Sequence, residues 1–252
     1  MMYDNRVKAK MRSGNPVYGV ISPTTDPVIC EYLGWAGLDF YMIDGEHGPI
    51  GPAEAANLVR ACELSGTVPL ARVRSLDEKL ILQFLDAGVM GIMMPGVQTM
   101  ADIESLVQAV RYPPIGNRGV GPVRAANYMM GPLSQKDYVA LANREILILP
   151  QVEDLHAVEN LREMAGHPEV DGFIIGPRDL AMSMGYLDGP NHPEVQEVIQ
   201  EIFKVVLESG KLVGTVAGTA DQARALVAKG ATMILNSVQG LLSSGVNAFL
   251  KP

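Results

Sequence analysis

Short apolar segments alternate with longer amphipathic segments along almost the whole of this chain, and that alternation limits the folds it can adopt. Eight apolar runs have the character of buried strands: Val17–Ile21, Phe40–Ile43, Val68–Val73, Gly91–Met94, Ile146–Val152, Val170–Ile175, Leu212–Val216 and Met233–Leu235. Stretches with helical periodicity separate or follow them: Pro27–Ala36, Pro52–Leu64, Leu76–Ala87, Met100–Arg111, Leu155–Ala165, Pro193–Ser209, Ala220–Ala228 and Leu241–Phe249. Strands that alternate with helices predict a parallel sheet covered by helices.

Eight strand–helix units predict a single (β/α)8 TIM barrel over residues 1–252. A doubly wound open sheet is the alternative, but it normally carries a glycine-rich turn after its first strand, where this chain has Ser22-Pro23-Thr24-Thr25. The irregular stretch at about 112–143 is rich in proline and glycine. A long loop on a barrel is typical of a functional lid, so we expect that role here.

Composition narrows the function classes. Apolar residues make up 48% of the chain, which allows a large core, and the net charge of −8 argues against nucleic acid as a partner. No apolar run is long enough to span a bilayer. Two separate cysteines and no recognisable signal peptide lead us to expect a cytoplasmic protein without disulfides.

Ionisable residues cluster just after the second and third predicted strands. Asp44, Glu46 and His47 follow one strand and Arg72 closes the next. The carboxyl ends of barrel strands carry the catalytic groups, so His47 beside two acids suggests acid–base chemistry. Arg72 is either an oxyanion stabiliser or the partner of a structural ion pair with Asp44, Glu46 or Asp86.

A second group of polar residues follows the fifth and sixth predicted strands. Gln151 and Glu153 end one strand, and Arg178 and Asp179 follow the next. Because neighbouring strands lie roughly 5 Å apart, we expect Glu153 and Asp179 to converge on a hard divalent cation such as Mg²⁺ or Mn²⁺. The alternative is that these acids only cap helices.

Asp86, Trp35 and the lysines lie outside these two groups. Asp86 lies in a predicted helix and is either a surface acid or a carboxylate that orients His47. Trp35, the only tryptophan, is predicted to pack between helices. No lysine lies at a strand's carboxyl end, which argues against carbonyl activation through an imine.

Several motifs together resemble the HpcH/HpaI aldolase family, and in particular its class II pyruvate aldolases of the 4-hydroxy-2-oxoheptanedioate and 2-dehydro-3-deoxyglucarate type. The motifs run in order along the chain: Ile43-Asp44-Gly45-Glu46-His47, Arg72, Arg111-Tyr112-Pro113-Pro114, Arg118-Gly119-Val120-Gly121, Gln151-Val152-Glu153, Gly176-Pro177-Arg178-Asp179-Leu180 and Ser183-Met184-Gly185. The resemblance implies a metal-dependent (β/α)8 barrel that assembles as a hexamer. Ile21 and Arg178 depart from the family pattern, which bears on the aldehyde more than on the chemistry.

The resemblance also implies a role for each site residue. Glu153 and Asp179 would bind Mg²⁺ or Mn²⁺, with Co²⁺ also admitted, while Gln151, the backbone at Arg178, and Asp179 would contact the 2-oxoacid. Arg72 would stabilise the transition state. His47 would move the proton, and Asp86 would raise its basicity. In the mechanism we expect from these roles, Asp44 also orients His47.

The function expected from these residues is reversible, metal-dependent aldol cleavage of a 4-hydroxy-2-oxoacid to pyruvate and an aldehyde through a pyruvate enolate. Two alternatives remain open. One is a lyase for CoA thioesters of the malyl or citramalyl type, which would need a basic cluster for the CoA phosphates. The other is a non-catalytic barrel that binds oxoacids. We expect a small-molecule substrate and a homo-oligomer, without nucleic acid or membrane.

Overall fold

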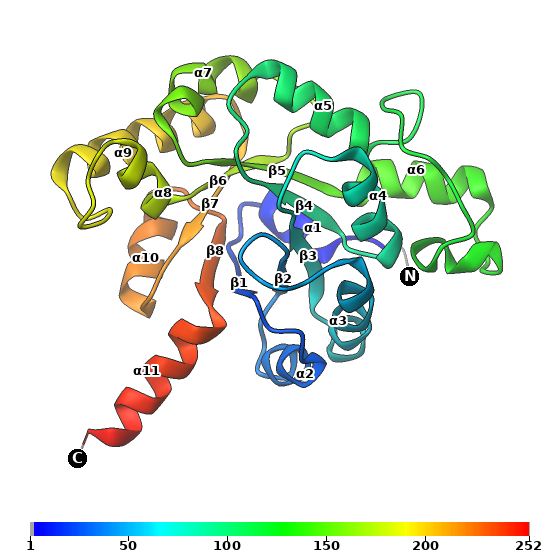
Figure 1. Ribbon diagram of the computed structural model, residues 1–252, viewed down its shortest axis with the longest axis horizontal. Coiled ribbons are helices and arrows are strands. Elements are labelled where there is room, and N and C mark those ends of the chain that lie inside the picture. The colour runs from blue at the N-terminus through cyan, green and yellow to red at the C-terminus, as the bar shows by residue number, and fades with distance from the viewer. Residues whose placement is uncertain (1–2, 252) are drawn as a thin grey trace.

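The computed structural model describes residues 3–251, which form a closed barrel of eight parallel strands surrounded by helices (Figure 1). The strands are β1 Val17–Ser22, β2 Phe40–Asp44, β3 Val68–Arg72, β4 Gly91–Met94, β5 Leu147–Val152, β6 Gly172–Ile175, β7 Leu212–Val216 and β8 Met233–Ser237. They follow one another around the barrel in chain order, and β1 pairs with β8. Closure confirms the (β/α)8 barrel and excludes the open sheet.

The helices are α1 Arg6–Arg12, α2 Pro27–Trp35, α3 Pro52–Ser65, α4 Glu78–Ala87, α5 Met100–Val110, α6 Gln135–Glu145, α7 Leu155–Ala165, α8 Pro177–Ser183, α9 Pro193–Glu208, α10 Ala220–Ala228 and α11 Val238–Leu250, with a 3-10 helix, η1, at Arg124–Met129. The ends of several helices are set by capping residues: Asp26 caps α2 by accepting from the amide of Val28. Gly66 and Gly88 end α3 and α4 in the left-handed conformation.

Continuous apolar sequence explains why the strands were predictable. Every residue of β2 to β6 is buried, as expected for strands covered by helices on one side and by the barrel interior on the other. The helices α1, α6 and α8 and the helix η1 were not predicted. They are short or mostly polar, and each buries only a few residues.

A buried polar cluster closes the amino end of the barrel. Lys8 on α1 places Nζ 2.9 Å from Oδ1 of Asp171, and both side chains are almost fully buried. The other carboxylate oxygen of Asp171 accepts a hydrogen bond from the amide of Ile148 and lies 3.7 Å from Arg111. Asn5 donates to the carbonyl of Met90, so the amino-terminal segment is tied to the barrel by satisfied polar contacts.

The long loop does not lie where a lid would. It leaves the end of α5 and leads into β5, so it belongs to the amino end of the barrel, opposite the carboxyl ends of the strands. Arg124 in this loop contacts Glu63 and the carbonyl of Ala87, near the ends of α3 and α4. The prediction of a lid over the chain's own site is therefore wrong.

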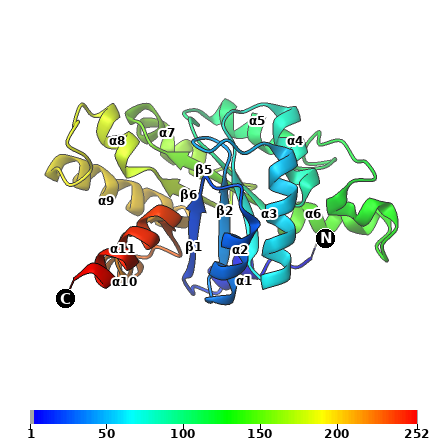
Figure 2. The ribbon, with the colours of Figure 1, turned by 60° about the horizontal axis from the view of Figure 1, so that its bottom comes forward.

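The last helix leaves the barrel instead of covering it. In Figures 1 and 2, α11 extends away from the strands and helices that precede it. Phe249, near its end, is 88% exposed, and Trp35 on α2 is 73% exposed, so the prediction that Trp35 packs between helices is also wrong. Among the described residues, no helix combines the length and apolar character needed to cross a membrane.

We predict that Asp171→Asn destabilises the protein by about 3–5 kcal/mol, because it leaves Lys8 as a buried cation without a full counter-charge. Urea unfolding followed by circular dichroism measures the change. Asp221→Asn, which removes an exposed helix pair with Arg224, is the control and should leave the midpoint almost unchanged. A loss below about 1 kcal/mol for Asp171→Asn would contradict the importance of this cluster.

Candidate active site

An ion pair between neighbouring strands lies at the carboxyl end of the barrel. The register aligns Asp44 of β2 with Arg72 of β3. Nε of Arg72 donates to one carboxylate oxygen of Asp44 at 2.9 Å, and Nη2 donates to the other at 2.7 Å. Both side chains are nearly buried, so this bidentate pair is well shielded from solvent. Arg72 therefore forms the structural ion pair with Asp44 that was one of its two expected roles. Its guanidinium still lies at the barrel mouth.

Asp44 also shapes the turn that follows β2. Its Oδ1 accepts from the amides of Glu46 and His47, each at 3.2 Å, in the manner of an Asx turn. Burial alone would raise the pKa of Asp44, but Arg72 and the two amides outweigh it and hold that pKa below its usual value. The ionised carboxylate is therefore part of the fold of this turn.

Glu46 lies between Arg72 and His47. Its Oε2 is 3.1 Å from Nη1 of Arg72 and 3.8 Å from Nε2 of His47. Burial, together with the charges of Asp44 and Asp179, raises the pKa of Glu46, although Arg72 and His47 oppose the shift. The ring of His47 is 66% exposed and faces solvent at the mouth. This side of the site therefore offers an imidazole, a carboxylate and a guanidinium in contact.

A second carboxylate group follows β5. Glu153 accepts a 2.7 Å hydrogen bond from the amide of Gly96, at the end of β4, and a close hydrogen bond from the side-chain amide of Gln151. Gly176 makes room for this arrangement, since a Cβ there would lie 2.6 Å from Nε2 of Gln151. Gln151 is 3% exposed, and its Oε1 has no hydrogen-bond partner among the described residues.

The acids near β5 and β6 differ in whether they cap a helix. Asp154 is the N-cap of α7, accepting from the amide of Ala157, and it also accepts from Gln98. Asp179 stands in the first turn of α8 without capping it and is exposed at the mouth, as is Arg178. The helix cap is therefore Asp154, whereas Asp179 caps no helix and Glu153 accepts from Gly96 and Gln151 instead.

The two halves of the mouth are close enough to influence each other electrostatically. Burial raises the pKa of Glu153; the amide of Gly96 opposes the shift, and the negative charges of Glu46 and Asp179 add to it. Of the two arginines at the mouth, Arg178 is exposed and Arg72 is already shared by Asp44 and Glu46. An excess of negative charge at one mouth suits a bound cation.

The structure does not bring Asp86 to His47 within one chain. Asp86 is next to last in α4, toward the amino end of the barrel, and its carboxylate lies 2.9 Å from Nη2 of Arg118. Arg118 in turn stacks over the ring of Tyr112, 4.5 Å from its centroid. The expectation that Asp86 orients His47 is therefore not met inside a single subunit.

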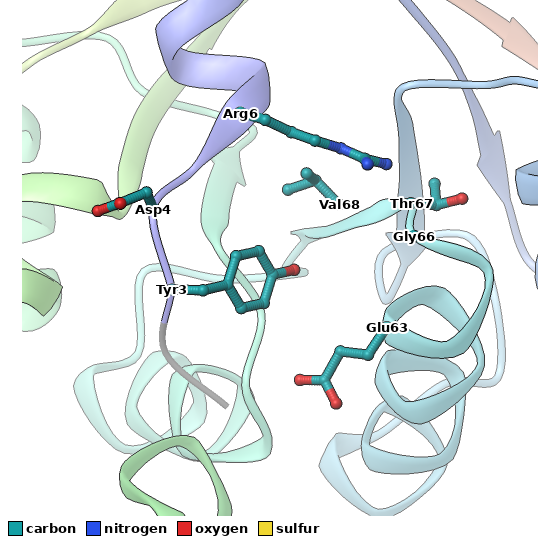
Figure 3. Close-up of a pocket in the computed structure, with 7 residues that line it drawn as sticks. All are labelled: Tyr3, Asp4, Arg6, Glu63, Gly66, Thr67 and Val68. Atoms are coloured by element: carbon teal, nitrogen blue, oxygen red, sulfur yellow. The ribbon is translucent and has the colours of Figure 1, made fainter. Parts of the chain in front are cut away.

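A separate cavity of about 380 Å³ lies away from these groups. It is lined by Tyr3, Asp4 and Arg6 of the amino-terminal segment and by residues of the α3–β3 turn, including Gly66 (Figure 3). None of the strand-end acids, nor His47 or Arg72, lines it. The cavity is not part of the candidate active site.

Sequence reasoning missed three contributors to the site. Gly96 supplies an amide to Glu153, and only the Pro95-Gly96 turn after a strand hinted at it. Gly176 is required because any side chain there would collide with Gln151. The Gly176-Pro177 pair was the only sign of this in the sequence. Glu46 was named only as one of three possible partners of Arg72, and its contact with both Arg72 and His47 was not foreseen.

The fold and these residues together define a barrel enzyme with an acid-rich mouth at the carboxyl ends of its strands. Comparison with known proteins is more specific. The chain belongs to the HpcH/HpaI aldolase/citrate lyase family, whose model matches residues 18–244, and it is accordingly a lyase.

Similar proteins cover nearly the whole chain. A 5-keto-4-deoxy-D-glucarate aldolase of Shigella dysenteriae serotype 1 is 36% identical over 233 residues, which is 92% of this chain and 90% of that protein. A solved HpcH/HpaI aldolase/citrate lyase family protein from Burkholderia cenocepacia is 31% identical, with a TM-score of 0.91 and 98% coverage of both chains. The citrate synthase SbnG is 27% identical, with a TM-score of 0.87, over 96% of this chain and 95% of its own.

We predict that Asp44→Asn lowers the free energy of unfolding by about 3 kcal/mol at neutral pH, because Arg72 loses its buried bidentate partner. The folded-state pKa of Asp44 lies below its ordinary value of 3.8. Its stabilising contribution is therefore complete above that value and is lost as the pH falls through the lower folded-state pKa. Urea unfolding at a series of pH values should show the difference between wild type and variant narrowing in acid.

The exposed Asp188→Asn is the control for that series and should match wild type throughout. A difference that stayed constant from neutral to strongly acidic pH would mean that the charge of Asp44 is not its source.

Proposed function

We propose that this protein catalyses the reversible aldol cleavage of a 4-hydroxy-2-oxoacid to pyruvate and an aldehyde. The observation that carries the proposal is the meeting of two groups at one barrel mouth: Arg72, Glu46 and His47 from the β2–β3 side, and Glu153 and Asp179 from the β5–β6 side. Relatives that are named 5-keto-4-deoxy-D-glucarate aldolase support it.

The donor set at the mouth fits a hard divalent cation. Glu153 and Asp179 offer carboxylate oxygens, and the negative charges there exceed the positive ones. Within the described chain, no group of three or more histidine, cysteine, aspartate or glutamate side chains is arranged to hold a metal. Two carboxylates suffice for Mg²⁺ or Mn²⁺, with Co²⁺ admitted, when the substrate supplies further oxygens. When bound, the ion would supply Lewis-acid polarisation of the 2-oxo group.

The protein's own residues would then bind the oxoacid and move one proton. Gln151, Asp179 and the backbone at Arg178 would contact the oxoacid. His47 would take the proton of the C4 hydroxyl as the C4 carbonyl forms, and the electrons of the C3–C4 bond would pass into the pyruvate half as its enolate. Arg72 would offset the negative charge that develops there, an effect typically worth about 3–4 kcal/mol of barrier for one such donor. A proton from water then adds to C3 of the enolate and releases pyruvate, and His47 gives the proton it took back to water.

We predict that the protein exchanges the methyl protons of pyruvate for deuterium in D₂O only when Mg²⁺ or Mn²⁺ is added, because the polarised carbonyl acidifies C3. Loss of the methyl signal in the NMR spectrum measures this without any choice of aldehyde. Glu153→Gln should lose Mn²⁺ binding and exchange together. The cap variant Asp154→Asn should retain both, because Asp154 is the N-cap of α7. No exchange by the folded wild-type protein with either metal would contradict the proposal and favour a CoA-thioester lyase or a binding protein.

We also propose that copies of this chain assemble by exchanging α11. A groove of about 350 Å³ lies over β8 and β1, lined by Tyr18, Val20, Ala220 and Ile234 among others, where the eighth helix of a barrel would pack. The helix that follows β8 extends away and exposes Leu242, Val246 and Phe249 at one-turn spacing. The groove over β8 and β1 lacks a covering helix, and the apolar face of α11 lacks a covering surface. Both are satisfied if α11 of a second copy packs into the groove.

We predict an assembly larger than one chain, a hexamer by family resemblance, in size-exclusion chromatography with light scattering. Replacing Leu242 and Phe249 together by Asp should lower the measured mass, because their apolar surface no longer favours burial. Leu187→Asp, an exposed leucine on the α8–α9 loop, is the control and should keep the wild-type mass. A wild-type monomer, or an unchanged mass in the double variant, would contradict helix exchange.

A further inference from the structure

Arg178 is a cation at the mouth that the fold leaves without a partner. It is the second residue of α8, it is exposed, and it stands next to Asp179 in the sequence. Within residues 3–251 its guanidinium forms no ion pair and no hydrogen bond, not even with that neighbouring carboxylate. Arg72 differs because it is nearly buried and already paired. A guanidinium presents a planar fork of N–H donors that fits a carboxylate, so Arg178 is free to bind an anion from solvent.

The backbone that carries Arg178 is firmly held by the rest of the barrel. The amide of Leu180 donates to the carbonyl of Gly176 at 3.0 Å, and the side chain of Leu180 is fully buried. At the end of α8, the hydroxyl of Ser183 accepts a hydrogen bond from the amide of Leu155 at 3.1 Å. The side chain of Arg178 therefore moves on a rigid base, which limits the positions that its guanidinium can reach.

That base adjoins the recess in which the oxoacid would bind. Gly176, two residues before Arg178, would bring a Cβ to 2.6 Å from Nε2 of Gln151 and 3.0 Å from Cβ of Glu153. Asp179, the next residue after Arg178, is near enough for its charge to raise the pKa of Glu153. A molecule held in the recess by its oxoacid end must therefore leave it along a rim of which Arg178 is part.

The surrounding charges make this cation important for an acidic substrate. Glu46, Glu153 and Asp179 act on one another as negative charges at the mouth, and Arg72 is already neutralised by Asp44. An aldehyde that carries a carboxylate would be repelled there unless a cation compensated it, whereas a neutral aldehyde would meet no such barrier. One guanidinium matches one carboxylate in charge and shape, while a phosphate dianion would need more positive charge than a single arginine supplies.

We propose that Arg178 is a specificity-determining residue that binds a carboxylate on the aldehyde half of the substrate. The substrate is then a 4-hydroxy-2-oxoacid with a second carboxylate beyond C4, and that carboxylate stays on the aldehyde when the C3–C4 bond breaks. Because Arg178 is a long side chain on an open rim, it selects for charge and restricts the length of the aldehyde less. The inference rests on the proposed aldol cleavage.

A selectivity ratio measured in the condensation direction tests this role. Initial rates with pyruvate and excess Mg²⁺ are compared for 4-oxobutanoate and for 4-methylpentanal, in which an isopropyl group replaces the carboxylate. The readout is kcat/KM for the acid divided by kcat/KM for the neutral aldehyde, from product signals in the NMR spectrum after subtraction of the rate without enzyme. Effects on folding, on the metal or on the oxoacid change both aldehydes alike and cancel in this ratio.

Arg178→Gln should lower the ratio about tenfold, as expected when a charge-assisted hydrogen-bond donor is lost at an exposed site. Arg178→Lys keeps the charge without the planar fork and should give an intermediate ratio. Added KCl should lower the ratio of the wild type more than that of Arg178→Gln, because salt screens the contact.

Arg60→Gln is the matched control. Arg60 is exposed on α3, and among the described residues its guanidinium donates to neutral groups, the side chain of Asn57 and the carbonyl of Ala56. The variant therefore removes the same charge without touching the mouth, and its ratio should equal that of the wild type.

Several results would overturn the assignment. A ratio for Arg178→Gln within about twofold of the wild type would mean that Arg178 does not meet the aldehyde. An equal fall in Arg60→Gln would assign the preference to net charge, and a ratio for Arg178→Lys as low as that for Arg178→Gln would exclude charge as its source. If Arg178→Gln affected glyceraldehyde 3-phosphate against glyceraldehyde more strongly, the anion would be a phosphate.

The same samples separate this inference from the proposed function. A wild-type protein that exchanges the methyl protons of pyruvate but condenses it with the neutral aldehyde alone would overturn the role of Arg178 and leave the aldol proposal standing. A folded wild-type protein that shows neither exchange nor condensation would contradict both.

Discussion

The ion pair between Asp44 and Arg72 organises the mouth of this barrel. The β2–β3 register places the two residues opposite each other, and burial strengthens their bidentate contact. Arg72 is thereby held at the carboxyl end of the strands, where its third nitrogen reaches Glu46. Asp44 in turn binds the amides of Glu46 and His47, so the loop that carries both side chains is built on the same carboxylate. Arg72, Glu46 and His47 are thus all held, directly or through the turn, by the carboxylate of Asp44 or its partner.

The sequence was sufficient for the barrel because its strands are nearly continuous apolar runs, a pattern that few other structures require. Strand ends were predicted to within two residues, for example Val170–Ile175 against the observed Gly172–Ile175. The helices α1 and α6 were not predictable in the same way. In α6 only Tyr138 and Ala142 are buried, so no apolar stripe distinguishes it from a loop.

The sequence also predicted which residues lie at the mouth of the barrel, but it predicted less well which of their side chains touch. Topology brings strand ends together, which is why Arg72, Glu153 and Asp179 could be grouped from the chain alone. Which acid meets which base depends on loop geometry that residue patterns do not encode. Asp86 pairs with Arg118, 32 residues further along the chain, while Glu46 meets His47 through a turn set by hydrogen bonds to Asp44.

The β5–β6 half of the mouth is deeper than the β2–β3 half. Gln151 is almost completely buried, and Glu153 is packed against Gly176, so this half has little freedom to adapt in shape. His47 is mostly in solvent, so the opposite half is open. A rigid recess rejects molecules that differ by one group, whereas an open rim tolerates many sizes. We therefore expect such a site to be strict about the oxoacid and permissive about the aldehyde.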